Sequence, residues 1–150
     1  MTWGELRSQR RVRPHKVTRG ELDELRAAIA VKLNDARSTS ISDDTRFTTA
    51  YGAALLIAKM AIACAGYRLD PKTGGHHRTA FEALPLAVGR KAKKLSGYFD
   101  ICRRKRNEID DDRPHVASRA DANEIINRAE ELESLVEDWI TTNHASLAKT

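Results

Sequence analysis

The sequence predicts an all-α protein, folded as an antiparallel helical bundle of four main helices plus one short helix. Apolar residues recur at steps of three and four along most of the chain, which is the period of an amphipathic helix. No segment shows the strict alternation of a half-buried strand. Aromatic residues make up only 5% of the composition, which argues against a β-sandwich, and 150 residues fit one domain with a single core.

The two ends of the chain are expected to lie outside this bundle. Residues 1–17 contain six basic side chains, His15 included, together with Pro14 and no helical period, and we expect a flexible basic arm. A frayed terminus without a function explains the same residues equally well. The bundle is expected to span residues 18–145, and residues 146–150 form a tail.

The first helix of the bundle has a clear start signal. Thr18 followed three residues later by Glu21 has the pattern of a capping box. The polar segment 38–42 ends the helix. Its apolar stripe comprises Leu22, Leu25, Ile29, Leu33 and Ala36.

The second helix is predicted to be the central one. It begins at Ser42 or Asp43, and Asp43 and Asp44 suit the positive end of a helix dipole. Residues 53–65 are apolar on nearly all sides, which is typical of a buried helix. Gly66 is a plausible stop signal.

Three further helices complete the predicted bundle. A short helix covers residues 78–88, where Pro85 bends or shortens it and Gly89 ends it. A longer helix covers residues 92–109, and the last helix runs from 119 to 145.

Charge is polarised along the chain. The net charge is +5 and the pI is about 9.4, a weak indication of an anionic partner. Residues 90–106 contain eight Lys and Arg against one acid, whereas residues 121–138 are strongly acidic. The basic segment would suit an RNA backbone, and the acidic one a basic partner protein. Ordinary solvated helix faces explain both segments as well.

The cysteines and the hydropathy indicate a cytoplasmic protein. Cys64 and Cys102 both lie within apolar helical patterns, as buried thiols do in a reducing compartment. No metal-ligand spacing is present, so no metal or other cofactor is expected. No signal peptide is evident and no segment reads as apolar enough to span a bilayer, so we expect no membrane association.

An arginine interrupts the apolar stripe of the helix at 92–109. The stripe runs Leu95, Phe99, Cys102, and its next position is Arg106, followed by Ile109. A buried guanidinium without a partner costs several kcal/mol, on the order of the penalty for a buried ion. Arg106 therefore pairs with an internal carboxylate, reaches solvent from a packed stem, or lines a polar cleft that binds an anion.

Other polar residues are candidates for the same cleft. Asp44 and Arg46 would reach it from the second helix, with Asp44 as the internal partner of Arg106. Alternatively they are a helix-capping acid and a surface arginine. His76 and His77 would touch a phosphate or cap the short helix, or they are simply polar loop residues.

The segment that contains this arginine resembles the motif of the HEPN superfamily, which is an arginine and a polar residue followed by a histidine. Here the motif segment is ArgArgLysArgAsnGluIle at 103–109. Residues 46–58 resemble the long second helix of HEPN bundles, and residues 66–68 and 75–84 resemble the following loop and helix. The resemblance covers about residues 20–140.

The resemblance implies a fold, an activity and partners. HEPN domains form homodimers with a composite cleft, and many are metal-independent RNA endonucleases without a cofactor. Many act as toxins with a nucleotidyltransferase-like antitoxin. By this resemblance Arg106 would stabilise the phosphorane charge and Asn107 would orient the phosphate, while Arg103, Arg104 and Lys105 would attract RNA.

The sequence departs from the family motif at the proton-transfer position. Asp111 stands where the motif has histidine, and His115 is too far along the chain. A carboxylate can act as a base but is a poor proton donor at neutral pH, and Asp111 would also neutralise Arg106. The first hypothesis is therefore an RNA-cleaving toxin or toxin-like defence protein, whose activity would be weakened or lost if Asp111 cannot replace the histidine. The alternatives are a non-catalytic HEPN module that binds a nucleotide or a partner protein, and a purely structural helical adaptor.

Overall fold

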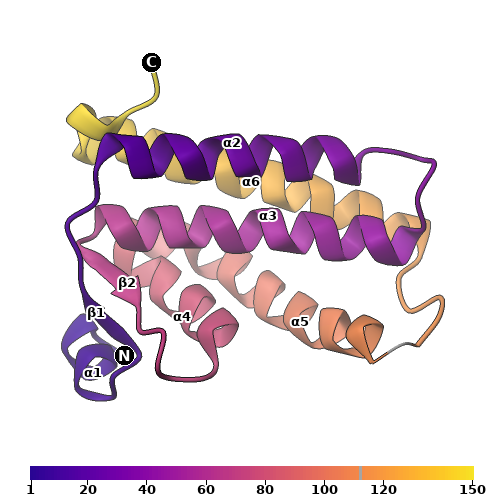
Figure 1. Cartoon of the computed structure of the whole chain (residues 1–150), viewed down its shortest axis with the longest axis horizontal. Helices are drawn as coiled ribbons and strands as arrows, with labels where there is room; N and C mark the ends of the chain where they lie inside the picture. The colour runs from indigo at the N-terminus through magenta and orange to yellow at the C-terminus, as the bar shows by residue number, and fades with distance from the viewer. Residues whose placement is uncertain (112) are drawn as a thin grey trace.

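The computed structural model describes residues 1–111 and 113–150. Within these residues the chain is mostly helical, as the sequence predicts, with one small antiparallel ladder of two strands (Figure 1). The helices are α1 (Trp3–Ser8), α2 (Arg19–Ala36), α3 (Asp43–Cys64), α4 (His76–Val88), α5 (Lys93–Asp110) and α6 (Arg119–Asn143). The strands are β1 (Val12–Pro14) and β2 (Tyr67–Leu69), and the 3₁₀ turns are η1 (Arg90–Ala92) and η2 (Ala145–Leu147).

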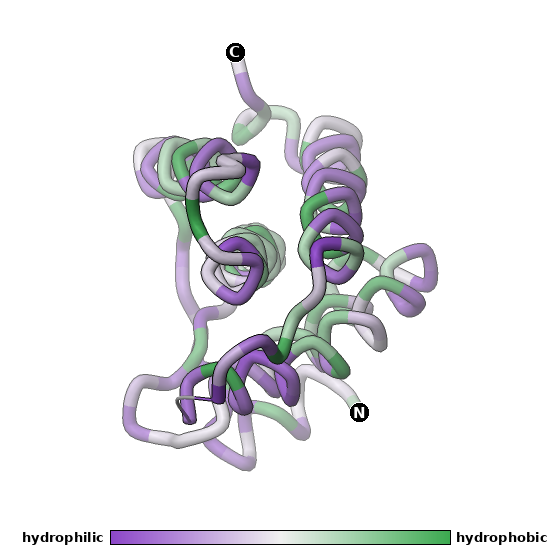
Figure 2. The backbone as a smooth tube through the Cα atoms, turned by 90° about the vertical axis from the view of Figure 1, so that its right-hand side faces the viewer, coloured by the Kyte–Doolittle hydropathy of each residue, from purple (hydrophilic) through white to green (hydrophobic). Residues whose placement is uncertain are grey.

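The helix α3 is the centre of the fold. α2, α4, α5 and α6 all pack against it, and Figure 1 shows α2 and α6 on one side of it and α4 and α5 on the other. α2 and α3 run in opposite directions. Seen along the helices in Figure 2, hydrophobic residues gather on the central helix and hydrophilic ones toward the outside. The predicted central position of this helix is confirmed.

The prediction that no segment is apolar enough to span a bilayer is wrong for α3. By length and composition this helix passes such a test, with a mean hydropathy of 1.5 in its most apolar window. In the structure 72% of that window is buried against the rest of the chain. The apolar composition of α3 is thus explained by its place in the core.

The N-terminal segment does not lack structure, and the prediction of a flexible arm over residues 1–17 is corrected here. It forms α1 and β1, and Leu6 and Val12 are fully buried. The ring of Trp3 stacks on Tyr67 with a centroid distance of 4.4 Å. Strands of three residues are too short to produce a recognisable alternation, so the ladder left no signal in the sequence.

Helix starts follow the predicted signals closely. The Thr18 side chain accepts a hydrogen bond from the Glu21 backbone N–H at 3.2 Å, although the Glu21 carboxylate binds His15 instead of closing the capping box. Ser42 caps α3 in the same way. The short helix α4 begins at His76, two residues earlier than predicted, and Pro85 lies inside it.

Aromatic packing fixes α4 against α5 and so positions the site. The rings of Phe81 and Phe99 stack at 5.6 Å, and Tyr51 of α3 lies 5.8 Å from Phe81. The buried Ser96 hydroxyl donates to the Phe81 carbonyl oxygen. Since α4 and α5 run antiparallel, this contact brings the first turn of α4 beside the second half of α5.

Candidate functional site: a cationic cavity between α4 and α5

A cavity of about 270 Å³ opens where the first turn of α4 meets the second half of α5. Its lining contains arginines and histidines but, within the described residues, no carboxylate. The start of a helix adds the positive end of its dipole. The cavity is therefore suited to an anion; its lining is Gly75, His76, His77, Arg78, Arg103, Arg106 and Asn107.

Arg106 lies at the edge of this cavity. Its guanidinium carbon is 6.0 Å from the centre of the Tyr51 ring, and its side chain is 31% exposed. Nη1 lies 3.0 Å from the Asp110 carboxylate, one turn further along the same helix. Arg106 thus reaches solvent beside Tyr51 and lines an open cavity, as two of the three arrangements require. The carboxylate that it pairs with is 45% exposed on the same helix and is not an internal one.

The carboxylate that pairs with Arg106 is not one of those considered from the sequence. Asp44 accepts a hydrogen bond from the Ala117 backbone N–H at 2.7 Å. Asp111 is the C-terminal cap of α5, where its backbone N–H donates to the Asn107 carbonyl at 3.1 Å. Asp111 is exposed and does not belong to the cavity lining, so the neutralising acid is Asp110.

The three basic residues expected to attract RNA occupy different places. Arg103 lines the cavity and pairs with Asp100 at 3.1 Å. Arg104 is 73% exposed at the surface of α5. The Lys105 ammonium lies 2.9 Å from the Asp121 carboxylate of α6. The hydrogen bond from the Ser118 backbone N–H, and secondly the one from Lys105, hold the pKa of Asp121 below its usual value. Only Arg103 therefore joins Arg106 and Asn107 in the cavity.

His77, one of the two histidines considered from the sequence, lines the cavity together with Arg106. Its Nδ1 lies 3.2 Å from the Tyr51 hydroxyl oxygen, and the two rings are 5.6 Å apart. Burial, and secondly the charge of Arg106, lower the pKa of His77 from its ordinary value. Burial raises the pKa of Tyr51. His77 is consequently neutral at pH 7 and available as a proton acceptor.

Two neighbouring residues have structural roles. His76 Nε2 is 2.6 Å from the Asp70 carbonyl oxygen, which fixes the loop before α4. Arg46 is buried, and its guanidinium binds the Ala36 carbonyl at 2.8 Å, Asp43 at 3.1 Å and Asn123 at 2.8 Å. Arg46 therefore joins α2, α3 and α6, and both roles considered for it from the sequence are wrong.

The sequence held one usable signal for His77 and Tyr51. The pair of histidines precedes an apolar helix, and Tyr51 occupies a stripe position with a hydroxyl that needs a partner when buried. Their contact joins two elements that lie 26 residues apart. Pairing them required the fold.

Within residues 1–111 and 113–150, no group of three or more His, Cys, Asp or Glu side chains is placed to hold a metal ion. No family model, no curated protein and no solved structure matches the chain. The class defined by fold and site is therefore a small, mostly helical protein with a cationic cavity beside its central helix.

Proposed function

We propose that this chain is a HEPN-like, metal-independent RNA endonuclease that acts as a cytoplasmic homodimer. Its biological role would be that of a toxin in a toxin–antitoxin or defence system, restrained by a nucleotidyltransferase-like antitoxin. One observation carries the proposal. Arg106 and Asn107 of the HEPN-like segment line an anion-suited cavity together with a neutral histidine, His77.

The first step is the binding of a phosphodiester in the cavity. Arg106 and Arg103 would donate charge-assisted hydrogen bonds to the non-bridging oxygens, and the Asn107 amide would orient the group. Such donors act most strongly on the charge that builds up on the phosphorane. Arg104 would attract the strand from the surface without reading its sequence.

The second step is a proton transfer through His77. When Nδ1–H donates to the Tyr51 hydroxyl oxygen, Nε2 is free to accept the proton of the RNA 2′-hydroxyl. The O2′–P bond forms, the P–O5′ bond breaks, and the same proton returns to O5′. The products are a 2′,3′-cyclic phosphate and a 5′-hydroxyl. The bonds and the proton are accounted for without a metal ion. His77 thus takes the role that the sequence analysis gave to Asp111.

The proposed dimer uses the exposed face of α5. Ile101 on this helix is 67% exposed, which is unusual for a large apolar side chain in the middle of a helix. A contact between two copies along α5 would cover Ile101. Sedimentation of Ile101→Asp should then show a larger monomer fraction than the wild type.

The proposal is tested with purified protein and cellular RNA in EDTA. Cleavage should be present in the wild type and should fall by about 10²- to 10³-fold in Arg106→Ala and His77→Ala, the usual cost of losing a transition-state donor or a proton-transfer group. Arg128→Ala is the matched control, because Arg128 on α6 has an intrahelical ion pair of 2.9 Å like that of Arg106. Equal cleavage by all four proteins would refute the assigned site.

A second candidate is a non-catalytic module that binds a nucleotide or a partner protein in the same cavity. It is favoured by the Asp110 ion pair, which reduces the charge of Arg106, and by the absence of Asp111 from the cavity lining. In that case RNA would bind without cleavage, and Asp111→His would restore cleavage only if the histidine enters the cavity. A structural adaptor would bind no RNA at any salt concentration.

A further inference from the structure

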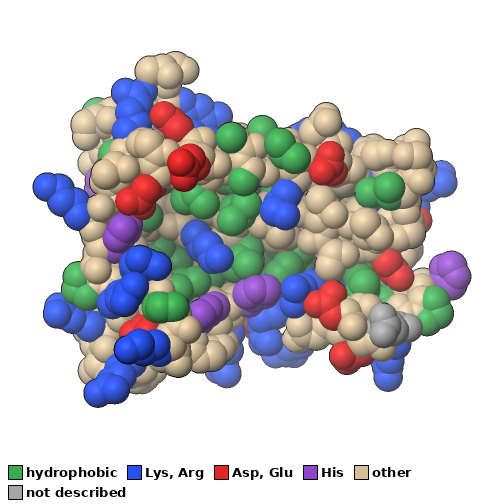
Figure 3. Space-filling view, in the orientation of Figure 1, with side chains coloured by type: hydrophobic (Ala, Val, Ile, Leu, Met, Phe, Trp, Pro, Cys, Tyr) green, Lys and Arg blue, Asp and Glu red, His purple; other side chains and the backbone are tan. Residues whose placement is uncertain are grey.

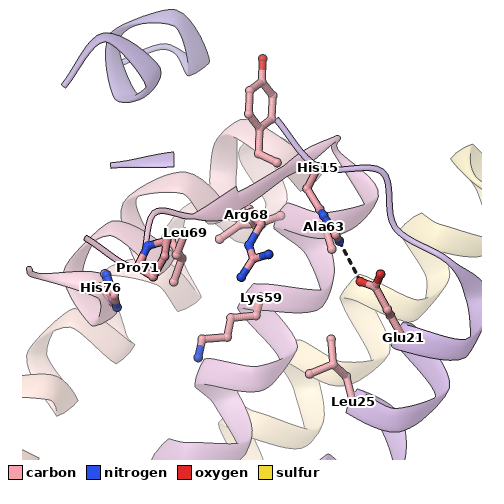
Figure 4. Close-up of a pocket in the computed structure, with 11 residues that line it drawn as sticks. His15, Glu21, Leu25, Lys59, Ala63, Arg68, Leu69, Pro71 and His76 are labelled. Carbon is pink, nitrogen blue, oxygen red and sulfur yellow. Dashed lines mark hydrogen bonds and ion pairs between the residues drawn. The ribbon is translucent and has the colours of Figure 1, made fainter. Parts of the chain in front are cut away.

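A second cavity of about 440 Å³ lies on the other side of His76 (Figure 4). It is formed by the start of α2, the last turns of α3, the strand β2 and the loop that precedes α4. On this face Figure 3 shows histidines and basic side chains around a hollow with hydrophobic atoms in it. Its lining is His15, Glu21, Leu25, Lys59, Ile62, Ala63, Tyr67, Arg68, Leu69, Pro71 and His76.

Two cations project into this cavity from different elements. Figure 4 shows the Lys59 ammonium, from α3, and the Arg68 guanidinium, from β2, both directed into the hollow. In the part of the chain that the structure describes, neither forms a salt bridge. Arg68 also lies directly opposite Arg13 in the ladder, an unfavourable pairing of like charges. A bound anion would offset this repulsion.

The acid in the cavity lining does not neutralise these cations. Glu21 is the carboxylate among the lining residues, and its Oε2 lies 2.7 Å from His15 Nε2. In Figure 4 this pair lies at the opposite wall from His76, with Lys59 and Arg68 between them. The cavity therefore presents two positive charges that have no partner in the described structure.

The remaining wall is apolar. Leu25 of α2, Ile62 and Ala63 of α3 and Leu69 and Pro71 beyond them line the hollow. A volume of about 440 Å³ falls in the range of small-molecule pockets. Apolar side chains beside two cations suit a compact molecule with one doubly charged end.

We propose that this cavity binds a small organic phosphate, a molecule of the size of a nucleoside monophosphate. Its phosphate dianion would lie between Lys59 and Arg68, because two cations match two negative charges and the guanidinium can bind two oxygens at once. Its less polar part would pack on Leu25 and Ile62. This site is separate from the Arg106 cavity and does not depend on RNA cleavage.

Isothermal titration calorimetry with AMP tests the proposal, with adenosine and inorganic phosphate as the two halves of the probe. AMP should bind more tightly than either half. Lys59→Gln and Arg68→Gln should each weaken AMP binding by about tenfold or more, the usual effect of losing a charge-assisted hydrogen bond. Lys16→Gln, an exposed lysine next to His15 that does not line the cavity, should bind AMP as the wild type does.

The Arg106→Ala variant separates the two cavities. AMP binding that persists in Arg106→Ala but falls in Arg68→Gln supports the proposal. If AMP binding is lost in Arg106→Ala and unchanged in Arg68→Gln, the phosphate binds in the Arg106 cavity and the proposal is overturned. Equal affinity for AMP in all variants, or no heat of binding in the wild type, would also overturn the proposal. Arg68 is exposed on a surface strand, so its variant remains decisive if Lys59→Gln does not fold.

Discussion

Replacing Asp110 with asparagine should strengthen RNA binding by the Arg106 cavity. Arg106 and Asp110 are 31% and 45% exposed and lie 3.0 Å apart at positions i and i+4. The order of the pair is unfavourable, because an acid near the C-terminus of a helix meets the negative end of the dipole. Asp110→Asn therefore frees the guanidinium at little cost to the stability of α5.

The size of the effect follows from the exposure of the pair. Exposed ion pairs are worth roughly 0.2–1 kcal/mol. A phosphate that binds Arg106 must compete with Asp110 for it, so removal of the competitor should raise the affinity by about 1.5- to 5-fold. The gain should shrink as salt is added, since both the pair and the phosphate contact are screened.

Fluorescence anisotropy with a labelled 2′-O-methyl RNA measures this gain without cleavage, because the nucleophilic hydroxyl is blocked. Glu131→Gln is the control, as it removes the same charge and frees Arg128 of α6 from a 2.9 Å pair away from the cavity. An affinity in Asp110→Asn no higher than in Glu131→Gln would mean that RNA does not contact Arg106, and the proposed site would be wrong.

Three further predictions concern stability and are read from urea unfolding. Arg46→Ala should lower the free energy of unfolding by about 3 kcal/mol, since the buried Arg46 guanidinium makes three hydrogen bonds that are lost and the buried Ala36 carbonyl loses its donor, and a loss under 1 kcal/mol would contradict the role given to Arg46. Gly89→Ala should lower the free energy of unfolding by about 1–3 kcal/mol, because Gly89 has φ of +103°, a conformation that strains an alanine. An added Cβ would meet no atom, so this variant tests backbone strain alone. The lowered pKa of His77 means that the unfolded chain binds a proton more readily than the native one. Stability should therefore fall as the pH drops below about 6.5, and His77→Gln should show a smaller fall between pH 7.5 and 5.5; an identical fall would argue against the buried, neutral state of His77.

The long helices were predictable because each signal is local. The stripe residues Leu22, Ile29 and Leu33 are buried as the period of three and four requires, and Ser42 and Thr18 cap their helices through bonds within four residues. The N-terminal segment was not predictable in the same way. Its order depends on the stacking of Trp3 on Tyr67, which lies 64 residues away and has no local signature.

The site was predictable only in part, for the same reason. The break in the α5 stripe predicted an unusual environment for Arg106, and the structure places this residue at the edge of a cavity. The sequence did not show that Arg106 pairs with Asp110 and not with Asp111, because this depends on how the last turn of α5 ends. Arg46 looked like a surface residue because its partner Asn123 is 77 residues away. The pKa of His77 is lowered chiefly by burial beside Tyr51 and secondly by the charge of Arg106, and both causes depend on the fold.

The position of Arg106 also follows from the lengths of two helices. At 1.5 Å per residue, α4 spans roughly 20 Å and α5 roughly 27 Å. The antiparallel seam that holds Phe81 against Phe99 therefore runs out of α4 near its first residue, His76, and the next stripe position of α5 faces an opening. A long polar side chain fits such a place whether or not it binds RNA, so the position alone does not argue for catalysis.

Arg106→Met separates the two explanations, because it keeps the packed stem and removes the charge. If Arg106 only packs between the two helices, Arg106→Met should leave the affinity for RNA unchanged. If Arg106 binds a phosphate of the RNA, Arg106→Met should lower the affinity for RNA and reduce the salt dependence of binding.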